Sequence, residues 1–280
     1  TRLVRDIWVG TPGTTLGNLT QYRGEVYFTA SQPGTGDELW KTDGNDAWLV
    51  ADLNPGNASS RPSRLRSVWH GPGDERLWMF AESDFSVNRL VVYNGNVDEA
   101  TDVFVGVRPT DFVDVKGTVY ATATTTAGSN DETIFRIEAT DDTTYTTTAV
   151  VAQNVRSMIG YGDQLLLSAT VPAYGTELFR LAGATLELLA DIRPGPAVST
   201  PRGFVEADEA VYFLANDGVD GIQLWRTDAT AAGTARATTI SGGLNVSGAL
   251  VALPTGGLAF AANSAKAGTE LWVKPPTASA

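Results

Sequence analysis

The residues of this sequence best suited to chemistry are four arginines that recur at similar intervals along the chain: Arg64, Arg108, Arg156 and Arg202. A guanidinium group binds carboxylate, sulfate or phosphate through paired hydrogen bonds, so arginines gathered at one place form an anion site. The alternative is that each arginine forms an ion pair with an acid of a neighbouring segment, such as Asp111, Glu206 or Asp208. The sequence leaves both interpretations open.

Two aromatic residues and one acidic loop are further candidates for binding. Phe85 and Tyr174 lie between expected strands, where an exposed ring can stack on a sugar; packing against the adjacent strands is the alternative. The loop "NDGVDG" places Asn216, Asp217 and Asp220 close together, and calcium is bound by clustered oxygen ligands. The loop has few acids for such a site, so a solvated loop without a metal is the alternative.

The common catalytic groups are scarce in this sequence. His70 is the one histidine and there is no cysteine, which argues against a Ser-His-Asp triad, a two-histidine metal site and a thiol nucleophile. Catalysis would have to use carboxylates, tyrosine or a metal held by oxygen ligands alone, as in a sialidase-like glycosidase or a lyase. We assign no catalytic residue and favour a protein that is not an enzyme, with the carboxylate-dependent glycosidase or lyase kept as an alternative.

The composition excludes several classes of partner. The net charge is −12 and the pI is near 4.5, whereas nucleic-acid binding depends on clustered lysine and arginine. No apolar run reaches the roughly 18 residues that a membrane span requires. With 42% apolar residues, the chain can bury a sizeable core.

A sequence repeat organises these residues. An aliphatic residue followed in most units by an aromatic one recurs at Leu39, Leu90, Ile134, Leu178, Leu224 and Leu271. The spacing defines six units of about 46 residues. Each unit contains four short segments rich in β-branched and aromatic residues that are bounded by turn formers, which predicts four β-strands.

Six units of four antiparallel strands predict an all-β fold, a six-bladed β-propeller over residues 1–274 with a C-terminal tail over 275–280. The N-terminal "TRLVRDI" (1–7) matches the fourth strand "LELLADI" (186–192). We therefore expect the N-terminal strand to complete the last blade, which would close the ring and remove an exposed edge.

The stretch "TDGN" (42–45) lies between the third and fourth strands of the first unit. Asp, Asn and Gly tolerate the positive φ angles of tight hairpin turns. The spacing of its oxygens does not fit a calcium loop, so we interpret it as a turn.

Aligning the first strands of the units places Arg156 and Arg202 at the same position, with Arg64 one residue later and Arg108 just upstream. In a propeller, the loops at this end of the blades converge on the mouth of the central channel. The alignment predicts arginines around this mouth.

Several segments resemble the bacterial repeat written ELWxTDGTxxGTxxVxDIxPGxxSxP. They include "DELWKTDGN" (37–45), "ADLNPGNASSRPSRL" (51–65), "ADIRPGPAVSTPRGF" (190–204) and "QLWRTDATAAGTA" (223–235). Proteins with this repeat are mostly exported or surface-associated. The resemblance implies a secreted or cell-surface β-propeller, and it implies no particular activity.

The function favoured by these observations is that of a secreted, lectin-like, non-catalytic module that binds a glycan or an anionic small molecule at the channel mouth. It needs no cofactor, with calcium as an optional ligand of the acidic loop. A structural or adhesion propeller of a surface assembly, with protein partners, is the main alternative.

Overall fold

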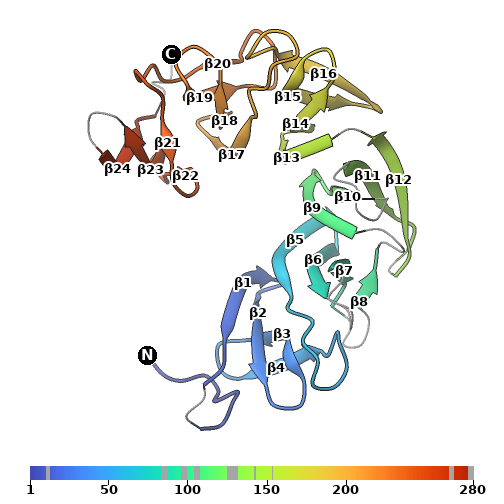
Figure 1. Ribbon diagram of the computed structural model, residues 1–280. Coiled ribbons are helices and arrows are strands. Elements are labelled where there is room, and N and C mark those ends of the chain that lie inside the picture. The colour runs from blue at the N-terminus through green and yellow to red at the C-terminus, as the bar shows by residue number, and fades with distance from the viewer. Residues whose placement is uncertain are drawn as a thin grey trace. The chain divides into compact units, whose positions relative to one another are not determined.

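The computed structural model describes residues 1–10, 13–82, 88–95, 100–103, 108–124, 132–141, 143–152, 154–264 and 268–276. Within these ranges, 24 β-strands form six four-stranded sheets (Figure 1). The predicted all-β class is therefore confirmed. No helix in the described ranges has the length and hydropathy that a membrane span requires.

The first three sheets follow the order of the sequence. The first consists of β1 (Leu16–Tyr22), β2 (Glu25–Gln32), β3 (Gly36–Thr42) and β4 (Ala47–Ala51). The second consists of β5 (Ser63–Gly71), β6 (Asp74–Glu82), β7 (Asn88–Tyr93) and β8 (Ala100–Asp102). The third consists of β9 (Arg108–Val115), β10 (Thr118–Thr124), β11 (Glu132–Ala139) and β12 (Tyr145–Ala152).

The next two sheets have the same order, and the last one differs. The fourth consists of β13 (Asn154–Tyr161), β14 (Gln164–Val171), β15 (Gly175–Ala182) and β16 (Thr185–Ala190). The fifth consists of β17 (Arg202–Ala207), β18 (Ala210–Asn216), β19 (Ile222–Thr227) and β20 (Ala235–Arg236). The sixth consists of β21 (Asn245–Val246), β22 (Val251–Ala252), β23 (Leu258–Ser264) and β24 (Gly268–Lys274).

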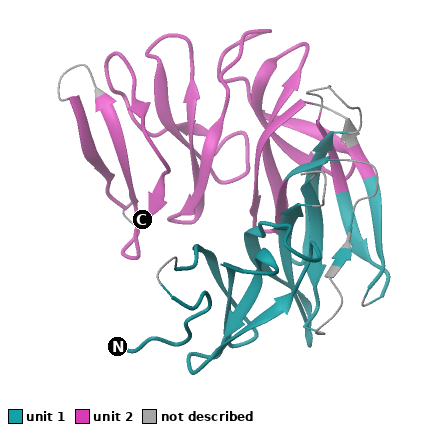
Figure 2. Ribbon diagram, turned by 60° about the horizontal axis from the view of Figure 1, so that its bottom comes forward, with its two compact units in different colours: residues 1–110, 116–127, 136–148 teal, residues 111–115, 128–135, 149–280 magenta. Residues whose placement is uncertain are grey.

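The chain divides into two compact units (Figure 2). Unit 1 contains residues 1–110, 116–127 and 136–148, and unit 2 contains residues 111–115, 128–135 and 149–280. Unit 1 thus holds the first two sheets, unit 2 holds the last three, and the third sheet contributes to both. A single domain over residues 1–274 stays a prediction, as does the tail, of which residues 277–280 lie outside the described ranges.

The aliphatic residue of the repeat marks the same register in different sheets. Leu39 of β3 is opposite Thr29, and Leu178 of β15 is opposite Ser168 in the corresponding strand of the fourth sheet. Both leucines are completely buried. In the first and fourth sheets, the spacing of this residue therefore predicts which strand lies in the interior and how it pairs.

The hydrophobic cores form between successive sheets of a unit. In unit 1, Tyr22 of β1 packs in one cluster with Met79 of β6. In unit 2, Leu178 of β15 packs with Phe213 of β18. First strands also contact one another, β1 with β5 in unit 1, and β13 with β17 in unit 2. Each sheet therefore covers one face of the next sheet within its unit.

A buried glutamate joins the first sheet to the linker that follows it. Glu38 of β3 is completely buried, and its carboxylate accepts hydrogen bonds from the backbone N–H groups of Leu53 and Ser60, both at 2.8 Å, and from the Ser60 hydroxyl. The Ser60 carbonyl in turn accepts the N–H of Glu82 at the end of β6, at 2.6 Å. One carboxylate therefore fixes the linker between two sheets.

The fourth sheet repeats this contact in unit 2. Glu177 accepts the N–H groups of Ile192 (2.9 Å) and Ser199 (3.0 Å) as well as the Ser199 hydroxyl, and the Ser199 carbonyl accepts the N–H of Asn216. In the fifth sheet Gln223 occupies the same position and binds its own linker. These hydrogen bonds explain why Glu and Ser recur together in the repeat.

The "TDGN" stretch is a hairpin turn, as predicted. The Asp43 carboxylate accepts the N–H groups of Asn45 (2.8 Å) and Asp46 (3.0 Å), and these bonds hold the pKa of Asp43 below its usual value. Asp228 closes the corresponding turn of the fifth sheet by accepting the N–H and hydroxyl of Thr230. The acids of these turns serve the fold.

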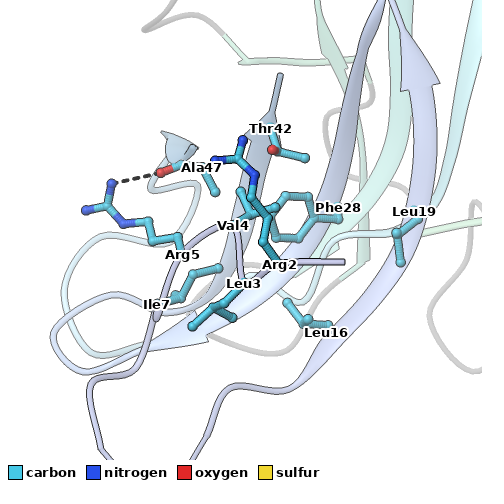
Figure 3. A pocket seen from close by; sticks show the side chains of 10 residues that line it. All are labelled: Arg2, Leu3, Val4, Arg5, Ile7, Leu16, Leu19, Phe28, Thr42 and Ala47. Atoms are coloured by element: carbon cyan, nitrogen blue, oxygen red, sulfur yellow. Dashed lines mark hydrogen bonds between the residues drawn. The ribbon is translucent and has the colours of Figure 1, made fainter. Parts of the chain in front are cut away.

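The segment before β1 differs from the prediction, because residues 1–6 form no strand. Arg2 donates a hydrogen bond to the Gly44 carbonyl (3.1 Å), and Arg5 donates one to the Ala47 carbonyl (3.0 Å). A cavity of about 280 Å³ with mainly apolar walls lies between this segment and the first sheet (Figure 3). Side-chain bonds to the turn between β3 and β4, rather than backbone pairing, thus hold the segment, and a closing strand is not observed.

The last sheet has an open outer edge. Both β21 and β22 pair with β23 and occupy the position of one first strand, while β24 has β23 as its neighbour among the described strands. Leu271 of β24 is 74% exposed, although Leu39 and Leu224 at the same repeat position are completely buried. A fourth strand would be needed to cover this edge.

We expect the Glu38 contact to make stability depend on pH. Burial raises the pKa of Glu38 from 4.5 to about 7. A raised pKa means that the folded state binds the proton more tightly than the unfolded state does. The resulting contribution to the free energy of unfolding is complete below pH 4.5 and is lost as the pH rises towards 7. Relative to Glu38→Gln, the free energy of unfolding of the native protein should fall by at most about 3 kcal/mol across this range in urea titrations.

The control is the exposed Glu209→Gln, measured in parallel, which corrects for the loss of one surface charge. A difference between the native protein and Glu38→Gln that does not change with pH would contradict the expectation.

Candidate functional site

The four predicted arginines are exposed and lie near the start of the first strand of their sheets: Arg64 in β5, Arg108 in β9, Arg156 in β13 and Arg202 in β17. Arg156 and Arg202 both belong to unit 2, where β13 and β17 contact each other. Arg64 and Arg108 belong to unit 1. The structure therefore places two of the four on neighbouring strands.

A β-bulge shapes the backbone at these positions. The register with the second strand shifts next to Arg64, Arg156 and Arg202. Arg64 has a φ of 52°, which is rare for a residue other than glycine, and Gly203 at the equivalent position has a φ of 65°. Bulges turn a side chain away from the regular alternation of a strand and are common next to functional sites.

Two of these arginines have contacts with groups that carry no charge. The guanidinium of Arg64 lies 5.7 Å from the centre of the Phe80 ring, and Arg202 donates to the Thr200 carbonyl at 3.4 Å. Asp208, one of the acids considered above, forms an ion pair with Lys274 at 3.5 Å. For Arg202, an exposed guanidinium bonded to a neutral carbonyl favours the anion-binding interpretation over ion pairing.

Tyr174 lies in the turn between β14 and β15 and is 39% exposed. Its N–H donates to the Val171 carbonyl at 2.9 Å, which closes the turn. The next residue, Gly175, has a φ of 69° and lies so close to the Ala197 carbonyl that a Cβ there would overlap with it. The turn that carries Tyr174 is therefore followed directly by a residue that lies against the linker after the fourth sheet. Phe85 lies outside the described residues.

Sequence reasoning missed Arg193, which belongs to the same linker. Its Nη1 donates to the Val198 carbonyl at 3.5 Å. Its side chain also lies against Gly218 of the fifth sheet, where a Cβ would be 2.8 Å from Nε. A comparison of the linkers "ADLNPG" and "ADIRPG" would have shown an arginine in place of an asparagine, but it would not have shown the contact with Gly218.

The loop considered for calcium uses its oxygens in other contacts. Asn216 accepts the N–H of Gly218 at 2.8 Å. Asp217 and Asp220 both accept hydrogen bonds from Arg236 Nη1, at 2.9 and 2.6 Å. A guanidinium thus occupies the place where a cation would be bound. In the described part of the chain, no group of three or more His, Cys, Asp or Glu residues is arranged to hold a metal ion.

His70 has a structural role in unit 1. Its Nε2 accepts a hydrogen bond from the indole N–H of Trp78 at 3.1 Å. The Trp78 ring also contacts the ring of Tyr145, whose hydroxyl accepts a hydrogen bond from the buried Arg76 at 2.7 Å. This cluster joins β6 of the second sheet to β12 of the third, and its imidazole is engaged in packing.

Comparison with known proteins shows likeness of fold alone. No protein-family model and no curated protein matches the chain. A structure from a study of two prolyl endopeptidases has a TM-score of 0.60 and 13% identity over 94% of this chain and 40% of that one. A puromycin hydrolase mutant complexed with PGG has a TM-score of 0.56 and 11% identity over 93% and 44% of the two chains. This chain therefore spans less than half of either protein.

A third structure, Aleuria aurantia lectin in complex with α-methyl-L-fucoside, covers 95% of this chain and 96% of its own with 10% identity. Its TM-score is 0.39. Together with the six sheets, the two higher-scoring structures support a fold made of four-stranded antiparallel sheets.

We expect calcium to leave the protein unchanged and Arg236 to stabilise it. Adding calcium chloride should not raise the melting temperature, because Asp217 and Asp220 are already bound to Arg236. Arg236→Gln should lower the melting temperature, because it leaves two carboxylates close together without their cation. Differential scanning calorimetry measures both. A calcium-dependent rise that Asp217→Asn abolishes would show that this interpretation is wrong.

Proposed function

We propose that the chain is a secreted or cell-surface binding module, without catalytic activity, that recognises a glycan or an anionic small molecule. The observation that carries the proposal is the pair of exposed arginines, Arg156 and Arg202, on contacting strands of unit 2. The resemblance to exported repeat proteins supports the location outside the cell.

The chemistry of these residues suits an anionic ligand. In a chain with a net charge of −12, neighbouring guanidinium groups create a local positive region, and each can bind a carboxylate, sulfate or phosphate through two hydrogen bonds. Tyr174 belongs to the same unit and has an exposed ring on which a sugar can stack. The arginines lie on strands, which hold a site more rigidly than loops do.

Ligand binding should depend on the two arginines. We expect at least one of a panel of sialylated, sulfated or uronate-containing glycans to raise the melting temperature in a thermal-shift assay. The double variant Arg156→Ala and Arg202→Ala should weaken binding about tenfold or more, because two charge-assisted contacts are lost. The matched control is Arg136→Ala, an exposed arginine of β11 that is paired with Glu138.

The outcomes separate the alternatives. A ligand that is bound with full affinity by the double variant would place the site elsewhere. Chemical conversion of a bound glycan would favour the glycosidase or lyase. Failure of every glycan and small anion to bind would favour a structural or adhesion protein that binds other proteins.

We further propose that the six sheets are the blades of a β-propeller and that residues 1–7 complete the last one. Leu271 on the open edge of β24 is exposed although its equivalents are buried, which is the state expected of a sheet that lacks its fourth strand. Leu3 of the N-terminal segment is likewise 77% exposed. Each unit thus contains an exposed leucine at a position where the repeat predicts a paired strand.

The packing of Ile7 supports the same assignment. Ile7 packs against the core cluster of the first sheet, as Leu53 packs against the cluster that includes the second sheet and Ile192 packs against that of the fifth. Leu53 and Ile192 each lie two residues after the end of a fourth strand. Ile7 therefore has the packing of a residue that follows a fourth strand, although residues 1–6 are not paired.

A disulfide trap tests this closure in the full chain, which has no cysteine of its own. The register of β15 with β16, in which Arg180 is opposite Glu187, predicts that Arg2 would be opposite Val273. Arg2→Cys combined with Val273→Cys should form a disulfide on mild oxidation, detected by mass spectrometry. The control pair combines Arg2→Cys with Val251→Cys, another exposed position of the last sheet. Equal cross-linking of both pairs, or of neither, would argue against the closing strand.

A further inference from the structure

The linkers after the first and fourth sheets share one backbone scaffold. Gly36 and Gly175 have φ angles of 73° and 69°, and each lies against the linker that follows its sheet, at the carbonyls of Ala58 and Ala197. The buried glutamate two residues later binds the backbone of the same linker in both cases. The two linkers therefore share one backbone scaffold and differ in the side chains that it carries.

In the first linker, side chains at the positions that differ between the two linkers form hydrogen bonds to the backbone of the scaffold. Asn54 is buried, and its amide donates to the Ser59 carbonyl at 3.4 Å. The Ser59 hydroxyl accepts the N–H of Asp37 at 2.9 Å. Thr35 occupies the turn before Gly36 and has no aromatic ring. This linker presents no aromatic or cationic side chain at these positions.

The second linker has different side chains at the same three positions. Tyr174 corresponds to Thr35, Arg193 to Asn54, and Val198 to Ser59. Tyr174 is 39% exposed, Val198 is 45% exposed and Arg193 is partly exposed. An aromatic ring, a cation and an aliphatic group thus replace polar residues on a backbone that folds without them.

The arginine of this set is held in place. Its Nη1 donates to the Val198 carbonyl, and its aliphatic part and Nε lie against Gly218 of the neighbouring loop. The acids of that loop, Asp217 and Asp220, are bound to Arg236. A guanidinium that is positioned by a neutral carbonyl, beside acids that are already paired, retains its capacity for an external anion.

From these contacts we infer that Tyr174 and Arg193 form a binding site for a saccharide that carries a carboxylate. The sugar ring stacks on Tyr174, and the carboxylate accepts hydrogen bonds from the Arg193 guanidinium, with Val198 beside them. Glu177 is a positioning residue, because it binds the backbone of the linker from Ile192 to Ser199. This inference goes beyond the proposed function, because it names a ligand class and places its contacts on residues other than Arg156 and Arg202.

Three small probes test the ligand class on the full chain: methyl β-D-glucuronide, methyl β-D-glucoside and acetate. The first has both ring and carboxylate, the second only the ring, and the third only the carboxylate. We expect the glucuronide to bind about tenfold more tightly than either of the others in ligand-observed NMR titrations. Arg193→Asn should remove the preference for the glucuronide over the glucoside, and Tyr174→Thr should remove its preference over acetate.

Arg193→Asn and Tyr174→Thr introduce the residues that the first linker has at the equivalent positions, so both variants are expected to fold. Circular dichroism checks this. The reverse exchange, Thr35→Tyr with Asn54→Arg, should add a second glucuronide site. Equal binding of the three probes, or unchanged glucuronide binding in both variants, would overturn the inference. Glucuronide binding that depends on Arg156 and Arg202 but not on Tyr174 or Arg193 would overturn this site and leave the proposed function standing.

Discussion

The structure depends on a buried carboxylate that binds a linker. A carboxylate in the interior is tolerated only where hydrogen-bond donors surround it, and in the first and fourth sheets the linker supplies these donors from its backbone and from one serine. The carbonyl of the same serine accepts a hydrogen bond from a backbone N–H of the next sheet. Sheet, linker and next sheet thus form one hydrogen-bonded chain, and the linker cannot change its path without leaving a buried charge unsatisfied.

This constraint separates the residues that fold the linker from those that are free to vary. The glutamate, the glycine two residues before it and the serine set the backbone, whereas the positions of Asn54 and Arg193 carry different side chains on the same path. Folds of this kind host different functions because the variable positions lie on a scaffold that does not need them.

The sequence predicts the strands and their register because the repeated Leu or Ile is buried in each of the first five sheets. It also predicts the place of Arg156 and Arg202, because that place follows from the repeat. It does not predict that Arg236 binds Asp217 and Asp220, since this contact depends on how a loop and the short β20 meet in space. Arg193 was missed for the same reason, because its position depends on Gly218 of another sheet.

The last sheet is the least protected part of unit 2. Its first strand is split into two pieces of two residues each, so few backbone hydrogen bonds connect it to β23. Little apolar surface of β24 is removed from water. Local opening has the lowest free energy where contacts are few, so while β24 lacks a fourth strand we expect loss of structure in unit 2 to begin at this sheet and to reach the fourth sheet later. The linker with Tyr174 and Arg193 belongs to the part that opens late, and its geometry outlasts fraying of the C-terminal strands.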